Sequence, residues 1–531
     1  SGNTYRFRPD GSAIEQVTLG QVNPFGMCFD ALGNQFTADC HSRPVTMLLR
    51  GGCYESFGKP HDGLGYAPQM TGHDHGSTGI AGAVVYDDQS GFPADMQGSL
   101  FVGNVITNTV HRDRISWRGS SPWVERPEDF LVCDDWWFRP VDLQLGPDGA
   151  LYVADFYNCI IGHYEVDLRH PRRDRERGRI WRVVARDRAT AVPPDVLGLD
   201  ADGLERLLDS PNLTLRRLAA ARLPADRAAR ILADGSATDR MKAIALWAAA
   251  SGDLDAQAEA LARHPSRDVR VHLVKALDGA GAWTASRARI VRGLLADADP
   301  FVRRAAAEAV GSHGDSAALA PLLRVWKEAA ADDRQLVHAA RIAVRNLLRP
   351  PVGAAVDIAG LALDPADTRR LLEVATAVPD DATAWAAFQA ARAAAVPPEL
   401  LARSLASVAQ HCGTERVDEA VRLASAAAEP AAATRLWSAA VEGTTRAGRR
   451  IVAGTPLAEW SLHVVRRLLL PRPAADAVAL RTALTVVEQL QMAELFEAVA
   501  AVVADHALPA DCRSAGTATL ERLDADRAAP I

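Results

Sequence analysis

Residues 138–158 read FRPVDLQLGPDGALYVADFYN, and this stretch decides the fold of the front of the chain. Apolar and polar residues alternate over 141–145, which predicts a β-strand with one buried face. Residues 146–149 (GPDG) have the composition of a tight turn, in which glycine can take a positive φ angle. A short apolar strand follows and ends at Asp155. The stretch therefore predicts two adjacent antiparallel strands joined by a turn.

The same pattern occurs in two earlier places. Residues 24–39 align without a gap with residues 140–155, which lie 116 positions later, and residues 98–104 match the second half. A propeller blade takes about 40–50 residues. The turn glycines of the three copies are 65 and 51 residues apart, which is one blade with an inserted loop (58–82) and one blade without; they are Gly33, Gly98 and Gly149. The repeat therefore predicts about three blades of a partial β-propeller over residues 1–186.

Three blades form an open arc, whereas a propeller protects its sheet edges when the ring closes. The chain also begins inside a strand-like phrase, TYRFRPDG (4–11), with no signal peptide in front of it. We therefore expect that the chain is a fragment, and that its front blades lie before residue 1.

The sequence changes character after a polar, proline-ended linker at 187–194. Apolar residues then recur at i, i+3, i+4 and i+7, which is typical of amphipathic helices. The second helix of each pair opens near an arginine, and these residues are Arg216, Arg240, Arg270 and Arg303. The last three are 30 and 33 residues apart, which indicates an all-α HEAT/armadillo-type solenoid. We predict HEAT repeats over 195–350 and degenerate helical repeats that continue the solenoid over 351–531.

Composition bounds the possible functions. A chain of 531 residues exceeds the roughly 250–300 residues of a single core, so two or more domains are expected. The net charge of −7 gives no general attraction to nucleic acid, and the longest apolar runs are too short to span a bilayer. The seven cysteines lack the spacing of a disulfide framework or a zinc site. Without a Cys-x-x-Cys-His motif, the chain has no site for attaching haem c.

Several long phrases make a family resemblance specific. With the opening stretch they are GHDHGSTGIAGAVVYDD (72–88), FPADMQGSLFVGN (92–104) and GRIWRV (178–183). They resemble the later blades of quinoprotein glucose/sorbosone dehydrogenases. They are still more similar to the propellers of planctomycete-type large membrane-bound dehydrogenases (the PVC-type haem-binding family), which join such a propeller to HEAT repeats. The resemblance implies a six-bladed propeller, an extracytoplasmic (periplasmic) location, pyrroloquinoline quinone (PQQ) with calcium, and a haem module outside this chain.

The resemblance assigns cofactor binding to Asn23 and Arg139. Three further family ligands are replaced here: a glutamine by Phe25, a lysine by Ile106 or Thr107, and a second arginine by Val141. A tricarboxylate quinone needs several cationic or amide donors, because a buried carboxylate without partners is costly. These replacements argue against quinone binding in the family's manner. They leave both a working dehydrogenase and a repurposed propeller open.

The sharpest polar cluster is His73-Asp74-His75, in a loop flanked by glycines. Imidazole and carboxylate groups at this spacing can hold a metal, and His75 is also the candidate catalytic base. In the alternative interpretation, the histidines bond backbone groups of a turn. Asp39 and Asp155 end equivalent strands, so they are candidates for a shared calcium or metal site, with turn capping as the alternative.

Residues 134–139 (DDWWFR) place acids, aromatic rings and a cation just before the key strand. Saccharide sites use aromatic platforms and carboxylates, so Asp135, Trp136 and Trp137, with Asn158 after the strand, are candidates for substrate binding. The alternative is that these rings cover the rim of the propeller.

Three hypotheses follow. The first is an extracytoplasmic sugar or polyol dehydrogenase, a quinoprotein-type oxidoreductase acting on CH–OH groups. The second is a non-catalytic propeller that binds a carbohydrate or a protein, and the third is a structural scaffold. Solenoids of this kind usually present a surface to a protein partner, which we expect on the helical arm.

Overall fold

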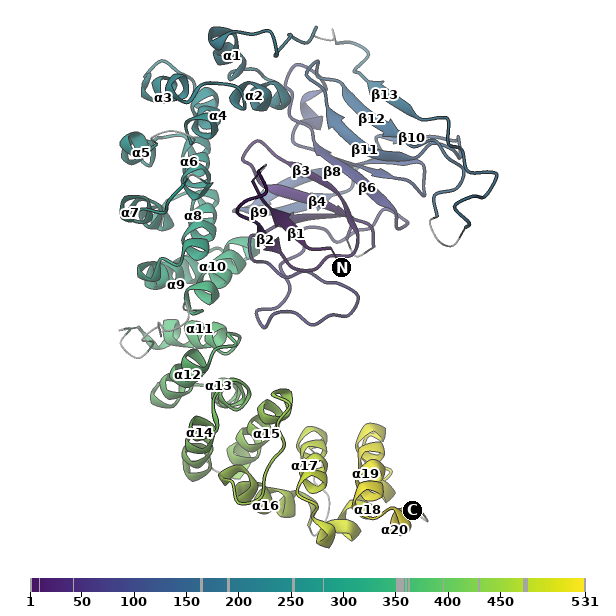
Figure 1. Ribbon diagram of the computed structural model, residues 1–531, viewed down its shortest axis with the longest axis vertical. Helices are drawn as coiled ribbons and strands as arrows, with labels where there is room; N and C mark the ends of the chain where they lie inside the picture. The colour runs from purple at the N-terminus through teal and green to yellow at the C-terminus, as the bar shows by residue number, and fades with distance from the viewer. Residues whose placement is uncertain are drawn as a thin grey trace. The chain divides into compact units, whose positions relative to one another are not determined.

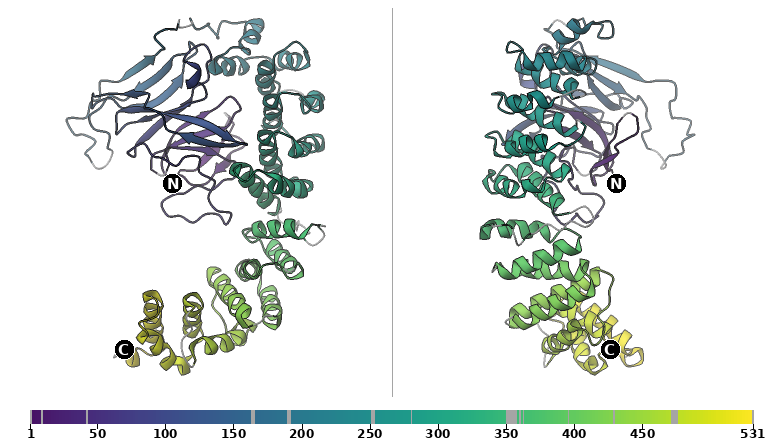
Figure 2. Two further views of the ribbon diagram at one scale, coloured as in Figure 1. Left: turned by 180° about the vertical axis from the view of Figure 1, so that it is seen from behind. Right: turned by 60° about the vertical axis from the view of Figure 1, so that its left-hand side comes forward.

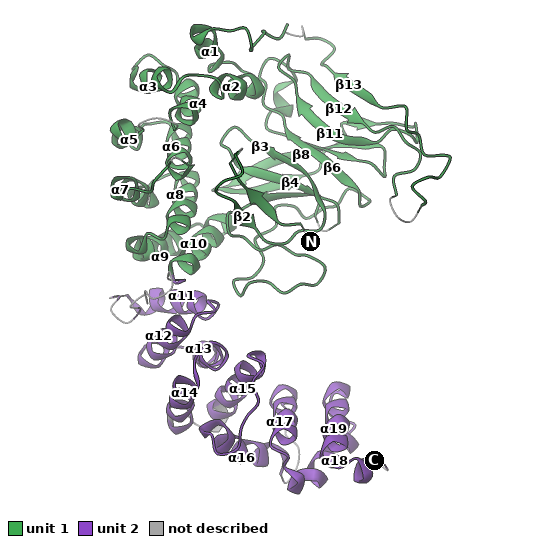
Figure 3. Cartoon of the chain, viewed as in Figure 1, with its two compact units in different colours: residues 1–347 green, residues 348–531 purple. Residues whose placement is uncertain are grey.

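The computed structural model describes residues 2–8, 10–41, 43–162, 166–188, 192–250, 254–279, 281–349, 358, 361, 363–394, 396–427, 430–470 and 476–529. They form two compact units, residues 1–347 and 348–531, which Figure 3 colours separately. The first unit contains the β-sheets together with helices α1–α10, and the second contains helices α11–α20. The predicted linker lies partly outside the described residues.

The described strands form four antiparallel sheets, all in the first unit (Figure 1). A two-stranded ribbon pairs β1 (Thr4–Arg6) with β2 (Glu15–Thr18). The first large sheet has the order β3 (Pro24–Phe29), β4 (Gln35–Asp39) and β5 (Val45–Leu48). The second has the order β10 (Leu131–Val132), β8 (Thr109–Arg118), β7 (Leu100–Asn104) and β6 (Ile80–Val85), with β9 (Ser121–Glu125) paired to β8. The third has the order β11 (Pro140–Leu145), β12 (Leu151–Asp155) and β13 (Arg179–Val183).

The three large sheets stack as successive blades of a partial propeller, which confirms the predicted fold class. The first strands lie side by side, since β3 packs on β6 and β6 packs on β11. In each sheet a glycine with positive φ turns the chain from the first strand to the second: Gly33 (+71°), Gly98 (+70°) and Gly149 (+78°). The three glycines therefore mark equivalent bends in successive sheets.

Two other glycines let neighbouring blades approach closely. A Cβ atom on Gly26 in β3 would lie 2.5 Å from the carbonyl oxygen of Ala81 in β6. A Cβ atom on Gly82 in β6 would lie 2.3 Å from the Cα of Asp142 in β11. Both positions need glycine because any side chain would collide with the backbone of the next blade.

The solenoid of the first unit consists of helix pairs. Its helices are α1 (Ala201–Leu207), α2 (Leu213–Ala220), α3 (Ala225–Ala233), α4 (Asp239–Ala249), α5 (Asp255–Leu261), α6 (Arg267–Gly279), α7 (Ala285–Gly293), α8 (Pro300–His313), α9 (Leu319–Glu328) and α10 (Arg334–Leu347). Asp299 caps α8 by accepting a hydrogen bond from the Phe301 N–H at 2.8 Å. Arg270 donates to the carbonyl of His264 and pairs with Asp297, so it stabilises the junction between repeats.

The even-numbered helices α2–α10 face the blades, as the two views of Figure 2 show with Figure 1. Their polar side chains hold the blade turns. The Nε2–H of His272 donates to Ala31 O at 2.8 Å, and Lys275 donates to Gly33 O at 2.6 Å. Asp333 accepts hydrogen bonds from Ser120 and Ser121 in the β8–β9 turn. A series of hydrogen bonds therefore joins the blades and the inner helices of the first unit.

The second unit is helical throughout its described residues. Its helices are α11 (Pro365–Ala375), α12 (Asp381–Ala393), α13 (Pro398–His411), α14 (Thr414–Ala427), α15 (Pro430–Arg446), α16 (Pro456–Leu469), α17 (Ala477–Gln489), α18 (Phe496–Ala504), α19 (Ala510–Leu523) and α20 (Ala525–Ala528). Its core includes the fully buried rings of Phe388 and Trp437. Among the described residues of either unit, no helix has the length and apolarity that crossing a membrane requires.

Candidate metal centre

Two histidines of the loop before β6 meet an aspartate of β8. The loop is held against the second blade, because Thr71 bridges to Val124 of β9 and the Val124 N–H donates to Met70 O. In β8, His111 and Asp113 are two residues apart, so both side chains lie on one face of the sheet. This arrangement brings His73 and His75 over Asp113, although Asp113 is 40 residues from His73 in the sequence.

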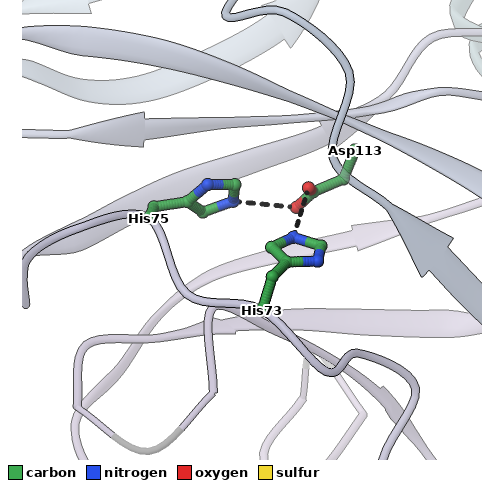
Figure 4. Close-up of side chains that lie close together, drawn as sticks. All are labelled: His73, His75 and Asp113. Carbon is green, nitrogen blue, oxygen red and sulfur yellow. Dashed lines mark hydrogen bonds and ion pairs between the residues drawn. The ribbon is translucent and has the colours of Figure 1, made fainter.

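Asp113 contacts both imidazoles at once (Figure 4). His73 Nε2 lies 3.0 Å from Asp113 Oδ1, and His75 Nε2 lies 3.0 Å from Asp113 Oδ2. The side chains of His75 and Asp113 have no exposed surface, whereas that of His73 is 22% exposed. One ligand atom from each of the three residues lies within 4.8 Å of the others. The cluster is therefore buried on one side and open to solvent through His73.

The electrostatics keep Asp113 charged. Burial raises the pKa of Asp113, but the hydrogen bonds from His73 and His75 outweigh burial and hold the pKa below its usual value. The buried carboxylate is therefore an anion, which is the form that binds a cation.

A second histidine–aspartate pair lies behind the first. The ring of His111 stacks on that of His75 with centroids 4.0 Å apart, and His111 Nδ1 lies 2.7 Å from Asp129 Oδ1. Burial and the neighbouring His75 lower the pKa of His111, although Asp129 opposes them. Asp129 is also paired with Arg126. His111 therefore supports His75 as a neutral ring with a fixed orientation.

The geometry is compatible with two states of the cluster. Without a cation, the two Nε2–H groups donate to the Asp113 carboxylate and satisfy it. Tetrahedral zinc has ligand distances of about 2.0–2.2 Å, which separates its ligand atoms by about 3.3 Å. Each imidazole lies 3.0 Å from a different oxygen of Asp113, and the three ligand atoms lie within 4.8 Å of one another, so they must draw closer around an ion. Each histidine then carries its proton on Nδ1 and leaves Nε2 to the metal. Three protein ligands leave a fourth position for water or an anion.

The predicted ligands separate into two groups. His73 and His75 lie together, whereas Asp74 is exposed and caps the turn by accepting from the Gly76 N–H at 2.9 Å. The side chain of His75 has no exposed surface in this conformation, and its role as a catalytic base stays a prediction. His73 is the member of the cluster that meets solvent.

Asp39 and Asp155 occupy equivalent strand ends but serve as turn caps. Asp39 accepts from the N–H groups of Val22 and His41, each at 2.8 Å. Asp155 accepts from the N–H groups of Arg139 and Tyr157 and from the indole of Trp181. Carboxylates surrounded by N–H donors are poor cation ligands. These bonds agree with the turn-capping alternative, and the calcium site at the two residues stays a prediction.

The residues that the resemblance assigns to the quinone do not fit that cofactor. Arg139 is buried, and its guanidinium donates to the backbone carbonyls of Asn158 at 2.9 Å and Val105 at 2.6 Å. Burial lowers the pKa of Arg139. Asn23 is exposed with a positive φ of 50°. The three replaced ligands are exposed apolar side chains: Phe25 (74%), Ile106 (42%) and Val141 (39%).

The predicted saccharide residues are only partly together. Asp135 accepts from the Trp137 N–H, and the Trp137 ring lies against Tyr157 with centroids 5.4 Å apart. Trp136 is 79% exposed. Asn158 is buried and bonded to the backbone of Ile160 and Asp174, so it contributes no free amide.

Three residues of this region were not predicted from the sequence: Asp113, His111 and Asp129. The pattern His111-Arg112-Asp113 within a strand was the available signal, because residues two apart share a face. Nothing in the sequence indicated which loop that face would meet.

Comparisons with known proteins support the two architectural halves. Residues 1–187 match the family model described as a domain of unknown function (DUF7133), and residues 254–342 match the model for HEAT repeats. No curated protein matches the chain. The DUF7133 match spans the blades and the HEAT match lies within the helices. Two different family models therefore match different parts of one compact unit.

Some solved structures show a limited similarity to the chain. A protein described as a 'putative oxidoreductase (glucose dehydrogenase)' from Thermus thermophilus is 23% identical, with a TM-score of 0.23, over 28% of this chain and 43% of that one. A Kap121p mutant is 13% identical (TM-score 0.38; 60% and 41% covered), and Kap121p bound to Ste12p is 12% identical (TM-score 0.38; 61% and 42% covered). The chain thus spans less than half the length of these structures.

Proposed function

We propose that this chain is a non-catalytic binding scaffold whose propeller region holds one divalent transition-metal ion of the zinc class. One observation supports this proposal above the others: two imidazoles converge on one buried, charged carboxylate at 3.0 Å each. Imidazole and carboxylate are ordinary ligands of zinc. The open position beside His73 is then the point at which the ion takes up water or an anionic group.

Metal analysis of the purified full chain tests this proposal. After equilibration with zinc and removal of the excess, we expect about one ion per chain, because the three ligands form one site. Cobalt(II) at the same site is expected to show the visible absorption of a tetrahedral centre. The Asp113→Asn variant is expected to lose the ion, whereas Asp95→Asn, which removes a 67% exposed carboxylate of the same unit, is expected to retain it. A wild-type chain without metal, or an Asp113→Asn variant that keeps it, would contradict the proposal.

The partner of the scaffold is a protein bound by the helical repeats. Polar contacts with the blades already occupy the inner helices α6, α8 and α10. We therefore assign the protein-binding surface to helices α11–α20, whose arginines stay in solvent, as Arg435 (52% exposed) and Arg466 (54% exposed) do. A pull-down experiment distinguishes this surface from the blades. It compares residues 1–531 with a variant in which the solvated arginines of α14–α17 are neutralised. Only the unchanged chain should retain the partner.

The catalytic version of the proposal is an extracytoplasmic sugar or polyol dehydrogenase with PQQ and calcium. The commitment of Arg139 to backbone carbonyls is an argument against it. Adding the quinone and calcium to the full chain is expected to give neither bound quinone absorbance nor sugar-dependent dye reduction. Turnover in that assay would contradict the scaffold proposal and support the dehydrogenase proposal. The extracytoplasmic location belongs to both versions and is checked by fractionating the native cells.

A further inference from the structure

A cavity separates the first blade from the inner helices of the solenoid. Its volume is about 470 Å³, within the 300–1,000 Å³ usual for small-molecule sites. Strands β1 and β3 line one side, and helices α4, α6 and α8 line the other. None of the metal-cluster residues lies in its wall, so the cavity is independent of the function proposed above.

Two charged groups face this cavity with bonding capacity to spare. Within 4.0 Å, Glu308 of α8 reaches one cation among the described residues, the Nε of Arg304, and it keeps 25% of its side chain exposed. Lys275 of α6 makes one hydrogen bond, to Gly33 O, and has two further N–H donors. The two groups form no ion pair within 4.0 Å of each other in the described part of the chain. Their mutual attraction therefore acts over more than 4.0 Å, and each group can still take a direct ionic partner.

Their electrostatics agree with this geometry. Burial raises the pKa of Glu308 above its usual value, although Arg304 and Lys275 oppose the rise. Burial lowers the pKa of Lys275 to about 8, although Glu308 and Asp30 oppose the fall. Both shifts have the sign expected when a charge is taken out of water without full compensation.

The other charged residues around the cavity are already paired. Arg50 bonds to Glu15 and Asp278. Arg304 donates to Ser120 O at 2.5 Å and to the side chain of Asn34. The available recognition groups are therefore one carboxylate and one ammonium.

The apolar wall is aromatic and fixed in place. The indole of Trp247 donates to His272 Nδ1 at 2.9 Å, which fixes the orientation of the ring, yet 45% of Trp247 stays exposed. Phe29 stands on the opposite side with 41% of its surface exposed. Both residues also line an adjoining space of about 380 Å³. An apolar side chain between them would remove aromatic surface from water.

We propose that this cavity binds a small zwitterion with an apolar side chain, an α-amino acid or a short peptide. The ligand ammonium pairs with Glu308, its carboxylate pairs with Lys275, and its side chain lies against Trp247 and Phe29. A ligand of a single charge would satisfy one of the two groups and be repelled by the other. A neutral polyol would bond to both groups but leave both charges without compensation.

Calorimetric titration of the full chain tests this with L-phenylalanine as the probe. N-acetyl-L-phenylalanine removes the ammonium, L-phenylalanine amide removes the carboxylate, and xylitol is the neutral polyol. We expect L-phenylalanine to bind, each blocked derivative to bind roughly 10- to 100-fold more weakly, and xylitol not to bind. Equal affinity for the three phenylalanine compounds, binding of xylitol instead, or no binding of any probe would overturn the proposal.

Variants connect each charge to its partner. Glu308→Gln should weaken L-phenylalanine roughly 10-fold or more but leave the N-acetyl derivative bound at least as tightly, because that derivative has no ammonium to lose and its carboxylate is no longer repelled. Lys275→Gln should show the same pattern with the amide. Glu328→Gln, which changes an exposed acid at the end of α9, is the matched control and should change nothing. If a cavity variant fails to fold, the comparison of blocked and free phenylalanine on the wild-type chain still decides the outcome.

Discussion

The two helical stretches of this chain use the same architecture in different ways. In α2–α10, charged side chains of the inner helices are covered by the blades: Arg304 has only 5% of its side chain exposed and bonds to the turns of two sheets. In α11–α20, arginines pair with acids of a neighbouring repeat and stay in solvent. Arg435 is 52% exposed beside Glu399, and Arg466 is 54% exposed beside Glu494.

This difference shows that buried charges on a solenoid helix mark the surface that another part of the chain covers. A cation is taken out of water where backbone carbonyls or carboxylates replace its hydration. In α6–α10 those carbonyls come from blade turns of the same chain. The described part of the second unit contains no strands, so no turn between strands supplies such carbonyls. Its charges form exposed pairs instead.

The largest test of this comparison removes one arginine from each stretch. Arg304→Ala is expected to lower the free energy of unfolding of the first unit by about 3–5 kcal/mol, because it leaves buried acceptors unpaired. Arg435→Ala should cost at most about 1 kcal/mol. Denaturant unfolding with hydrogen exchange read in both units separates the effects, and equal losses would remove the distinction between the stretches.

Acid should also lower the stability of helices α2–α10, which the blades cover, before it lowers that of α11–α20. Burial lowers the pKa of His272 to about 3, so the unfolded chain takes up a proton near pH 6.5 while the folded chain does not. Stability is therefore complete above pH 6.5 and falls by about 1.4 kcal/mol per pH unit below it, down to about pH 3. Burial acts in the same direction on His338, whose pKa is about 4.

The variant His272→Gln sharpens the pH test, because glutamine can still accept from Trp247 and donate to Ala31. Thermal unfolding between pH 7 and pH 4.5 should lose a large part of its pH dependence in this variant. If the wild-type and variant profiles coincide, the buried neutral histidine is not a source of acid sensitivity.

Glycine substitutions compare blade packing with helix packing. Gly82→Ala places a Cβ against the β11 backbone and should destabilise by about 1–3 kcal/mol. Gly293→Ala meets no atom within 4 Å and should stabilise α7 by about 0.5–1 kcal/mol. Melting temperatures of the two variants should therefore move in opposite directions. A neutral Gly82→Ala would mean that the blades are not held as closely as described.

The smallest expected effect concerns the solvated pairs of the second unit. Arg481→Gln removes an ion pair to Asp511, whose two side chains are 39% and 60% exposed. We expect a loss of about 0.2–1 kcal/mol at low salt that disappears near 0.5 M salt. A loss that persists at high salt would indicate a buried contribution.

The candidate site was half visible in the sequence. The pattern His73-x-His75 is local, so two ligands could be found from spacing alone. Asp113 could not be chosen among the acids, because its role depends on the loop of 71–76 lying along β9. Asp39 and Asp155 were found through the repeat, but the repeat could not distinguish a cation ligand from a turn cap. That distinction depends on which N–H groups surround each carboxylate.

Local pattern by itself determined the three blades, their turn glycines and the helical repeats. Strand alternation, positive-φ turns and helical periodicity act between residues close in the chain, so they are readable without coordinates. Only the tertiary structure decided that the blade turns dock on the inner helices, that two histidines share Asp113, and that Glu308 and Lys275 face one cavity. Those contacts join residues tens to hundreds of positions apart, and burial, rather than local preference, sets their energies.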